Sequence, residues 1–260
     1  KMTDPIYPDF VARSGQVNTP PGSYDTVKEW IREGFIHNDS RVLEIGCTTG
    51  FNSYQINRYT GAKVVGIDLS AEAVEKAKTD CQGISNLEFR VADAGKLPFK
   101  EGQFSHVIIS GHLPWVPHEY REPHVREAMR VLKHDGMLLT SLYYFHKNPP
   151  QELLDQFNTA FSTSLSANED RDYWAKILNQ PELVLEAEKD FLIERPDAAR
   201  MAEYIARFDP EFQEGWKKRA ELLSQNGEFL RFVMRVFQKV DKNNPFVQIP
   251  RGGIYTWHES

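Results

Sequence analysis

The chain has 260 residues, 40% of them hydrophobic and 26% charged, enough to bury the core of one large domain or of a domain with a small appendage. A formal net charge of -6 at pH 7 argues against nucleic acid as a partner, and the densest basic cluster, at 217–219, falls in a helical pattern that we expect to face solvent. Cysteine and histidine spacings suit neither a disulfide framework nor a metal site. With no long apolar run and no signal segment, we expect a cytoplasmic protein that does not span a membrane.

Residues 1–24 are rich in Pro, Gly, Ser and Asp and show little periodicity, so we predict an irregular N-terminal arm. From residue 25 a helical pattern begins, and short apolar strands then alternate with helices. The predicted strands are residues 41–45, 63–67, 87–91, 104–110 and 137–144, with helices starting near 51 and covering 71–81 and 120–132. This alternation predicts an α/β fold with right-handed βαβ units and a parallel sheet, which binds ligands beyond the carboxyl ends of its strands.

The alternation ends after residue 145. Two mostly helical stretches, 150–178 and 196–225, are separated by an extended piece at 183–193, and residues 228–240 alternate between apolar and polar side chains. This last pattern predicts a half-buried antiparallel strand. We therefore predict a core over 25–146 and 180–240, a helical lid over 147–179 and 196–226 that covers the carboxyl ends of the strands, and a tail over 241–260.

A glycine-bearing turn follows the first predicted strand. Gly46 and Gly50 let the backbone approach a ligand closely, and the following helix aims its first N–H groups at that ligand. Thr48 adds a hydroxyl donor, and Glu44 is placed to accept a hydrogen bond from a ligand ammonium. The alternative interpretation is a plain strand-to-helix turn, for which one glycine would suffice.

Acidic residues follow the next two strands. Asp68 closes the second strand, where a carboxylate can take both ribose hydroxyls of an adenosine, and Leu69 beside it can pack on an adenine face. Asp93, followed by Ala94, comes after the third strand, where a carboxylate can accept from the adenine amino group. The alternatives are a helix N-cap for Asp68, in competition with Ser70, and an Asx-turn for Asp93. One bound adenosine explains all three strand ends together.

These segments resemble the motifs of class I S-adenosylmethionine-dependent methyltransferases. The resemblance is carried by Val-Leu-Glu-Ile-Gly-Cys-Thr-Thr-Gly at 42–50, Gly-Ile-Asp-Leu-Ser at 66–70, Ala-Asp-Ala-Gly-Lys-Leu-Pro-Phe at 92–99, and the helix and turn at 127–139. It is close over 25–145 and weaker over 180–240. It implies a Rossmann-like, doubly wound sheet of seven strands whose last strand is antiparallel, here with the helical lid inserted after strand five.

The resemblance also implies site roles. S-adenosylmethionine would be the cofactor and S-adenosylhomocysteine the product, with Glu44 and the backbone of Gly46, Cys47, Thr48 and Gly50 facing the methionine part. Asp68 would bind the ribose, Asp93 and Ala94 the adenine edge, and Ser110 the methionine end. The sequence departs from the family at Thr48, where a glycine is usual, and the threonine Cβ is expected to narrow the floor under the cofactor.

Other functions fit less well. Asp68 would also suit the ribose of a nicotinamide cofactor, but the third glycine of the dinucleotide fingerprint falls at Phe51, which favours methyl transfer over hydride transfer. Two further alternatives remain: a cofactor-binding partner subunit without turnover, and an enzyme that uses the sulfonium for a reaction other than methyl transfer.

The loop after the fourth strand is expected to face the methyl acceptor. His112 and His118 have the chemistry of a general base, and Trp115 can wall the acceptor, although each could equally be an ordinary surface or packing residue. Tyr7 is expected to close over the cofactor, as arms of this family often do. Nucleic-acid amino methyltransferases of the family place Asn or Asp where His112 stands. The sequence therefore predicts transfer to an oxygen, nitrogen or carbon nucleophile of a small molecule, and it leaves the oligomeric state open.

Overall fold

The chain folds around one seven-stranded sheet. The computed structural model describes residues 6–192, 197–241 and 243. Within them the strand order is β3-β2-β1-β4-β5-β7-β6. The strands are β1 (Arg41–Ile45), β2 (Lys63–Asp68), β3 (Leu87–Val91), β4 (Phe104–Ser110), β5 (Leu132–Phe145), β6 (Leu183–Leu192) and β7 (Leu230–Lys239). Neighbours among β1 to β5 pair in parallel, whereas β7 is antiparallel to β5 and to β6. The predicted Rossmann-like sheet with an antiparallel last strand is confirmed.

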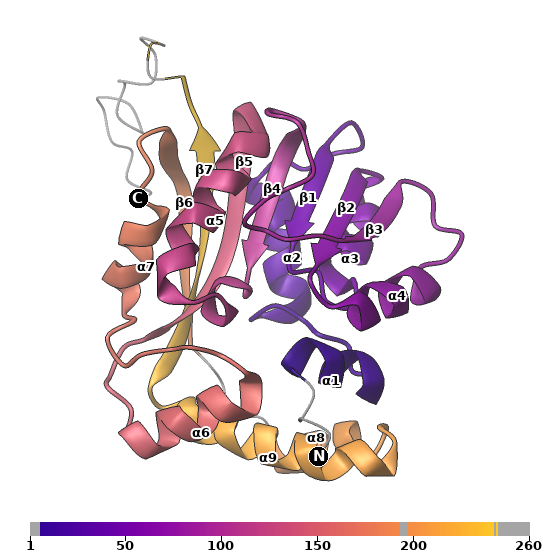
Figure 1. The fold of residues 1–260 in the computed structure, drawn as a ribbon, viewed down its shortest axis with the longest axis vertical. Helices are drawn as coiled ribbons and strands as arrows, with labels where there is room; N and C mark the ends of the chain where they lie inside the picture. The colour runs from indigo at the N-terminus through magenta and orange to yellow at the C-terminus, as the bar shows by residue number, and fades with distance from the viewer. Residues whose placement is uncertain (1–5, 193–196, 242, 244–260) are drawn as a thin grey trace, which may run out of the picture.

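Helices cover both faces of the sheet and the carboxyl ends of its parallel strands (Figure 1). They are α1 (Tyr7–Ser14), α2 (Ser23–Glu33), α3 (Phe51–Thr60), α4 (Ala71–Asp80), the 3-10 helix η1 (Leu113–Trp115), α5 (His118–Val131), α6 (Gln151–Phe161), α7 (Arg171–Leu178), α8 (Ala198–Ile205) and α9 (Pro210–Asn226). The helices α2 and α3 pack on one face, and α5 and α7 pack on the other. Because both faces are covered, the central strands are almost wholly buried, which explains their short, continuous apolar runs.

The prediction of an irregular N-terminal arm is wrong for part of that arm, because residues 7–14 form the helix α1. A proline in its first turn presets the helical φ, and Gly15, at φ 72°, ends the helix in the left-handed conformation. The buried face of α1 carries Tyr7, Phe10 and Val11. Phe10 packs against Trp216 of α9, with ring centroids 5.2 Å apart. This apolar face was hidden in the sequence by the surrounding turn-forming residues.

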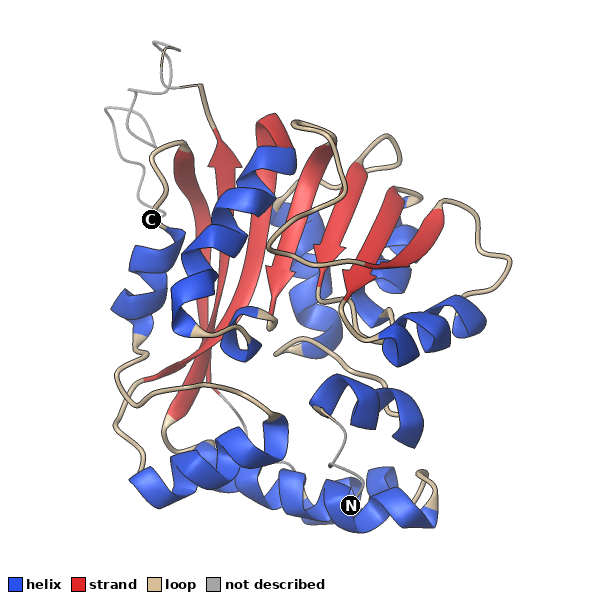
Figure 2. Cartoon of the chain, in the orientation of Figure 1, coloured by secondary structure: helices blue, strands red, loops and turns tan. Residues whose placement is uncertain are grey.

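A helical layer made of α6, α8 and α9 lies beyond the carboxyl ends of the parallel strands (Figure 2). The helix α7 instead packs on α5 and β5, at the face of the sheet. The predicted helical stretch 150–178 thus contains two helices in different layers. None of the helices in the described ranges is long and apolar enough to cross a membrane. The predicted tail, 241–260, lies almost entirely outside the described residues.

The strand β7 is not half-buried as predicted. Its residues are buried on both faces of the sheet, apart from two that are only partly exposed, and Arg235 is only 3% exposed. Arg235 Nε donates to Glu188 Oε2 at 2.6 Å, and Lys239 Nζ donates to the carbonyl oxygen of Met129 at 2.8 Å. These pairings compensate the two buried charges. The alternation of polar and apolar residues had placed Arg235 on the polar face of a half-buried strand.

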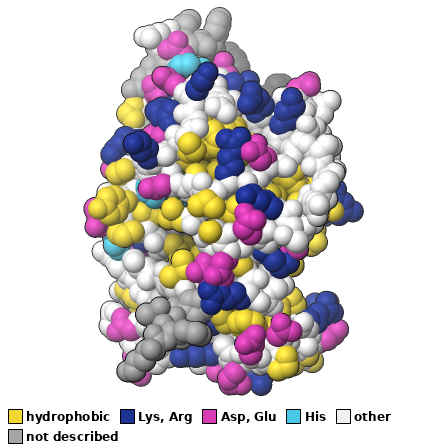
Figure 3. Space-filling view, turned by 45° about the vertical axis from the view of Figure 1, so that its right-hand side comes forward, with side chains coloured by type: hydrophobic (Ala, Val, Ile, Leu, Met, Phe, Trp, Pro, Cys, Tyr) yellow, Lys and Arg dark blue, Asp and Glu magenta, His cyan; other side chains and the backbone are white. Residues whose placement is uncertain are grey.

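The basic cluster at 217–219 is also not a solvated face throughout. Arg219 Nε donates to the carbonyl oxygen of Ala160 at 2.9 Å, and its guanidinium lies 3.9 Å from the ring centroid of Phe10. Arg219 thus links α9 to α6 and to α1. On the face shown in Figure 3, basic side chains are interspersed with acidic ones.

Candidate functional site

Predicted site residues from four strands meet at one edge of the sheet. The register pairs Ile45 of β1 with Ile67 of β2 and with Ile109 of β4. The residues that follow these three positions therefore begin at the same level along the sheet edge. Asp68 pairs with Val91 of β3, just before Asp93. The parallel sheet therefore brings together the ends of β1, β2, β3 and β4, as their order predicted.

The turn after β1 requires glycine at both of its ends. Gly46 and Gly50 have φ of 77° and 87°, in the left-handed region that favours glycine. A Cβ on Gly46 would lie 2.6 Å from His112 Cβ, and one on Gly50 would lie 2.6 Å from the ring of Phe89. The turn is therefore pressed between the loop after β4 and the strand β3.

Several amides of this turn bind within the protein. The N–H groups of Gly46 and Cys47 donate to the carbonyl oxygen of Ile67 at 2.8 and 2.9 Å. The N–H of Thr48 donates to Asp68 Oδ2 at 2.9 Å. These three hydrogen bonds hold the turn against the end of β2. Burial raises the pKa of the Cys47 thiol well above its usual value.

Thr48, the departure from the family pattern, adopts a left-handed conformation with φ 46°. A β-branched residue is strained there by about 1 kcal/mol or more. Its hydroxyl accepts a hydrogen bond from Asn18 Nδ2 at 3.1 Å, and its backbone N–H is held by Asp68. The N-terminal arm thus stabilises the position at which a glycine is usual.

Asp68 is the acidic residue at the centre of the site. It is 9% exposed, and besides Thr48 it accepts from the N–H of Ser70 at 2.9 Å. Ser70, and not Asp68, caps α4, because the Ser70 hydroxyl accepts from the N–H of Ala73 at 3.0 Å. Burial raises the pKa of Asp68. The N–H of Leu69 also lowers the pKa of the carboxyl, and about four lone-pair sites with three backbone donors leave one for a further donor such as a ribose hydroxyl.

Glu44 is committed within the protein. It is 2% exposed and accepts from Asn52 Nδ2 at 2.7 Å and from the N–H and hydroxyl of Ser53 at 2.9 and 2.5 Å. Desolvation by burial raises the pKa of Glu44 to about 7, against the lowering by these bonds. The carboxylate joins β1 to the start of α3, and its binding of a ligand ammonium stays a prediction.

The residues after β3 also have partners in the protein. Asp93 Oδ1 accepts from the N–H of Gly95 at 2.8 Å, the Asx-turn that the sequence offered as the alternative. Ala94 is buried, and Leu69, after β2, is 67% exposed. The contacts of these three residues with an adenine stay a prediction.

The two predicted catalytic histidines lie in different surroundings. His112 packs against Gly46 in space. Burial lowers the pKa of His112 to about 3, so its ring is neutral at pH 7. His118 opens α5, where its ring nitrogens lie 3.0 Å from the Tyr173 hydroxyl and 3.1 Å from the carbonyl oxygen of Ser164. The structure brings only His112 to the turn after β1.

Tyr7 and Trp115, both predicted to bind substrate, stack on each other. Their ring centroids are 5.8 Å apart and their planes meet at 17°. Trp115 Nε1 donates to the carbonyl oxygen of Phe161 at 2.7 Å, and Phe161 also meets Tyr7 edge to face at 5.2 Å. Burial raises the pKa of the Tyr7 hydroxyl. The arm, the loop after β4 and the helical layer therefore join at this stack.

Three residues near the site were missed from the sequence. Asn18 holds Thr48, His124 of α5 lies beside His112, and burial raises the pKa of Tyr143 of β5 to about 12. Asn18 lies in the arm without a motif, and Tyr143 looks like any strand residue. The one available signal was for His124, which lies between one and two turns into α5, the helix that begins at His118 and follows His112 in the chain.

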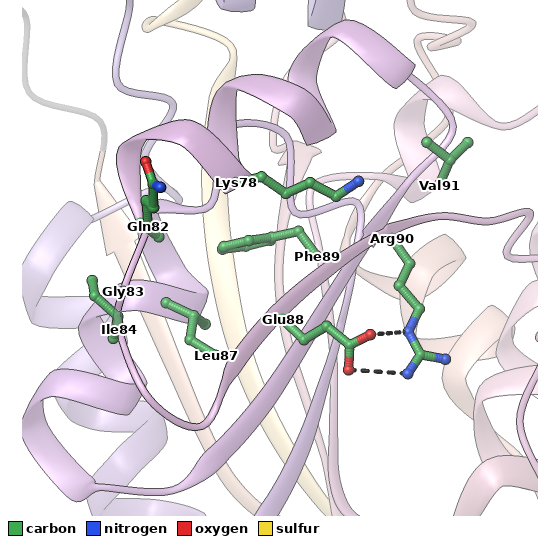
Figure 4. A pocket seen from close by; sticks show the side chains of 10 residues that line it. Lys78, Gln82, Gly83, Ile84, Leu87, Glu88, Phe89, Arg90 and Val91 are labelled. Atoms are coloured by element: carbon green, nitrogen blue, oxygen red, sulfur yellow. Dashed lines mark hydrogen bonds and ion pairs between the residues drawn. The ribbon is translucent and has the colours of Figure 1, made fainter.

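A surface pocket lies elsewhere, at the outer edge of β3 and the end of α4 (Figure 4). Its cavity volume is about 700 Å³, but none of the predicted site residues lines it. Glu88 and Arg90 of β3 pair with each other at one wall of the pocket, at 2.5 and 3.0 Å, so their charges are already satisfied. Lys78, which also lines the pocket, pairs with Glu75, and the pocket lies apart from the predicted site.

Comparisons with known proteins match the same part of the chain. A family model described as a methyltransferase domain matches residues 42–136. The ubiquinone/menaquinone biosynthesis C-methyltransferase UbiE of Pseudomonas paraeruginosa is 33% identical over 135 residues, which span 50% of this chain and 51% of that protein. The chain thus matches about half the length of this relative.

Solved structures resemble most of the chain. The crystal structure of the MccD protein has a TM-score of 0.74 and 25% identity, covering 86% of this chain and all of that one. The geranyl diphosphate C-methyltransferase of Streptomyces coelicolor A3(2), solved with S-adenosyl-L-homocysteine, has a TM-score of 0.64 at 17% identity over 84% of this chain and 79% of its own. At 17% identity, this second comparison shows a shared fold alone.

Proposed function

Because the chain carries a class I S-adenosylmethionine-dependent methyltransferase domain, we propose that it transfers the methyl group to an oxygen, nitrogen or carbon nucleophile of a small molecule. The cofactor is S-adenosylmethionine, and S-adenosylhomocysteine is the expected product. When bound, the cofactor supplies a methyl group on a positively charged sulfur, which is already activated for displacement.

The observation that supports a small acceptor is the helical layer over the carboxyl ends of the strands. The helices α6, α8 and α9 cover the carboxyl ends of the parallel strands, and both residues of the Tyr7–Trp115 stack contact Phe161 of that layer. A mainly apolar, covered site excludes water and admits a compact ligand more readily than a macromolecular surface. UbiE, as its name states, acts in ubiquinone and menaquinone biosynthesis, a small-molecule pathway that fits the same class of acceptor.

The residues present fit the cofactor. Asp68 keeps a lone pair for a ribose hydroxyl, and we assign the methionine part to the backbone of Gly46, Cys47, Thr48 and Gly50. We assign Leu69, Asp93 and Ala94 to the adenine, and Glu44 and Ser110 to the methionine end. Burial of the two carboxylates Glu44 and Asp68 also favours a cationic ligand, since a nearby positive charge lowers their raised pKa values.

The protein's contribution to the reaction is mainly alignment. The acceptor's lone pair forms the new bond to the methyl carbon, the bond from carbon to sulfur breaks with its electron pair on sulfur, and the acceptor's proton leaves for solvent. Holding the three atoms in line can lower the barrier by about 7–11 kcal/mol in ideal cases. His112 faces the acceptor as a neutral hydrogen-bond acceptor, with Tyr7 and Trp115 as walls. His118, held by Ser164 and Tyr173, stays a prediction as a second base.

The test is transfer of a labelled methyl group. The protein is incubated with methyl-labelled S-adenosylmethionine and a metabolite extract, and label is expected in a small molecule. Label in protein or nucleic acid would overturn the proposed acceptor class. Cofactor binding without any transfer would instead favour a non-methylating or partner-subunit role. The Asp68→Asn variant serves as the control for transfer that does not use this site.

A further inference from the structure

A second histidine, His124, lies beside His112, although the two residues belong to different elements. His112 follows β4, whereas His124 lies in α5. Their rings are nearly parallel, with centroids 5.7 Å apart and planes at 16°, and they meet edge to edge, with His112 Nε2 3.4 Å from His124 Nδ1. In neutral rings one of these nitrogens carries the proton and the other accepts it, because two bare lone pairs or two N–H groups would repel.

Asp93 decides which ring donates. A Cβ on Gly95 would lie 3.2 Å from His124 Nε2 and 3.3 Å from Asp93 Oδ1, so that nitrogen and the carboxylate face one small region. Burial lowers the pKa of His124, and the negative charge of Asp93 opposes that lowering. A carboxylate near Nε2 favours the proton on Nε2. His124 Nδ1 is then the acceptor, and His112 Nε2 is the donor.

The other nitrogen of His112 is left bare. Within the described residues, His112 Nδ1 is buried and has no hydrogen-bond partner. A buried polar atom without a partner destabilises the fold, and such atoms are uncommon in folded proteins. Nδ1 is bonded to Cγ, and Cγ lies 3.5 Å from the position of a Cβ on Gly46. This nitrogen therefore borders the turn assigned to the cofactor.

We propose that His124 is a positioning residue that holds His112 in the tautomer with its proton on Nε2, so that His112 Nδ1 presents a lone pair to the methyl acceptor. The role of Nδ1 toward the methyl acceptor rests on the proposed function. The tautomer of His112 does not depend on turnover. It also narrows the acceptor, because a bare lone pair selects a nucleophile that carries an N–H or O–H. A hydrogen bond to that proton turns the nucleophile's own lone pair toward the methyl group.

The test reads the tautomer directly. In protein labelled with ¹⁵N-histidine, long-range ¹H–¹⁵N spectra at neutral pH assign the protonated nitrogen of each ring, and no acceptor is needed. We expect His112 to carry its proton on Nε2 in the parent. A proton on His112 Nδ1 would overturn the proposal, whatever the variants do.

Variants separate positioning from packing. His124→Phe keeps an aromatic ring without the acceptor nitrogen, and we expect the share of His112 with its proton on Nε2 to fall toward that of a free neutral imidazole. In His124→Asn the amide oxygen takes the place of Nδ1, and we expect that share to rise again. The exposed His146 supplies the control, because His146→Phe should leave His112 unchanged. An unchanged tautomer in a folded His124→Phe would contradict the positioning role.

The two proposals fail in different ways. If no labelled methyl group reaches a small molecule while His112 shows the expected tautomer, the function is wrong and the ring pair stands. If methyl transfer occurs but the tautomer is the opposite one, the positioning role is wrong and the function stands.

Discussion

At the scale of single residues, the site depends on two buried carboxylates with different partners. Asp68 holds the backbone of Thr48 and Ser70, whereas Glu44 holds Asn52 and Ser53 at the start of α3. Burial raises both pKa values, which makes both carboxyl groups harder to ionise. A bound cation would lower these pKa values again. Their separate partners lead to separate predictions.

We expect Asp68→Asn to weaken cofactor binding by about 100-fold or more, because hydrogen bonds to a charged group contribute roughly 1.5–3 kcal/mol each. Titration calorimetry with S-adenosylmethionine measures this loss. Glu75→Gln is the matched control, since it removes one exposed negative charge of α4 that pairs with Lys78. A dissociation constant for Asp68→Asn close to that of the parent would remove Asp68 from the ribose site.

Glu44 should make stability depend on pH. Its pKa is about 7 in the folded protein and near the ordinary 4.5 when unfolded, so its contribution to stability is fully present below pH 4.5 and lost as pH rises through 7. Glu44→Gln cannot titrate. Its unfolding free energy relative to the parent should therefore rise between pH 4.5 and 8, by on the order of 3 kcal/mol.

Urea unfolding of both proteins at several pH values measures this difference, and titrating groups common to both proteins cancel in it. A difference that stays constant from pH 5 to pH 8 would show that Glu44 titrates normally.

At the scale of elements, the turn after β1 is defined by the elements that press on it. The conformation of Gly46 is shared by Gly15, which ends α1 with φ 72° and has nothing within 4 Å of the position of a Cβ. At Gly46 the same Cβ would lie 2.6 Å from His112 Cβ. The pair therefore separates backbone strain from close approach.

We expect Gly15→Ala to cost about 1 kcal/mol of unfolding free energy, from the left-handed conformation alone. Gly46→Ala should cost about 1–3 kcal/mol more, because the loop after β4 must move away. Chemical unfolding of both variants gives the comparison. Equal losses would mean that His112 yields freely and that the turn is not pressed by it.

At the scale of the whole molecule, a buried ion pair joins the segment after α6 to the helices on the sheet. Arg121 of α5 and Glu169 both have side chains that are 0% exposed, and their atoms lie 2.9 Å apart. The guanidinium also lies 5.0 Å from the ring centroid of Trp174, and Phe145 at the end of β5 donates its N–H to the carbonyl oxygen of Glu169 at 3.0 Å. These contacts fix the segment between α6 and α7 against the end of β5.

We expect Arg121→Met to lower the unfolding free energy by about 3–5 kcal/mol, because Glu169 would be left buried without its partner. The double variant Arg121→Met/Glu169→Leu should recover most of this loss. Arg126→Met breaks the exposed pair of Arg126 with Glu122 and should cost less than about 1 kcal/mol. A double variant no more stable than Arg121→Met would show that the pair is not the cause.

Much of the fold was predictable because it depends on local patterns. Buried parallel strands show short apolar runs, glycines mark the turns that follow them, and the ends of neighbouring parallel strands lie at one edge of the sheet. Asp68 and Gly46 could be placed at that edge from the sequence alone. The helix α1 and the buried Arg235 were mispredicted because a single turn-rich segment or a charged residue says nothing about what packs against it.

The sequence by itself determined the order of the elements from α2 to β5, the sheet and the position of the turn that we assign to the cofactor, since these follow from periodicity and from turn residues close together in the chain. Only the tertiary structure decided what each side chain at that turn does. It gave the cap of α4 to Ser70, set Asn18 against the strained Thr48, and brought His124 to His112. These contacts join separate elements, and their geometry exists only once the sheet and helices have packed.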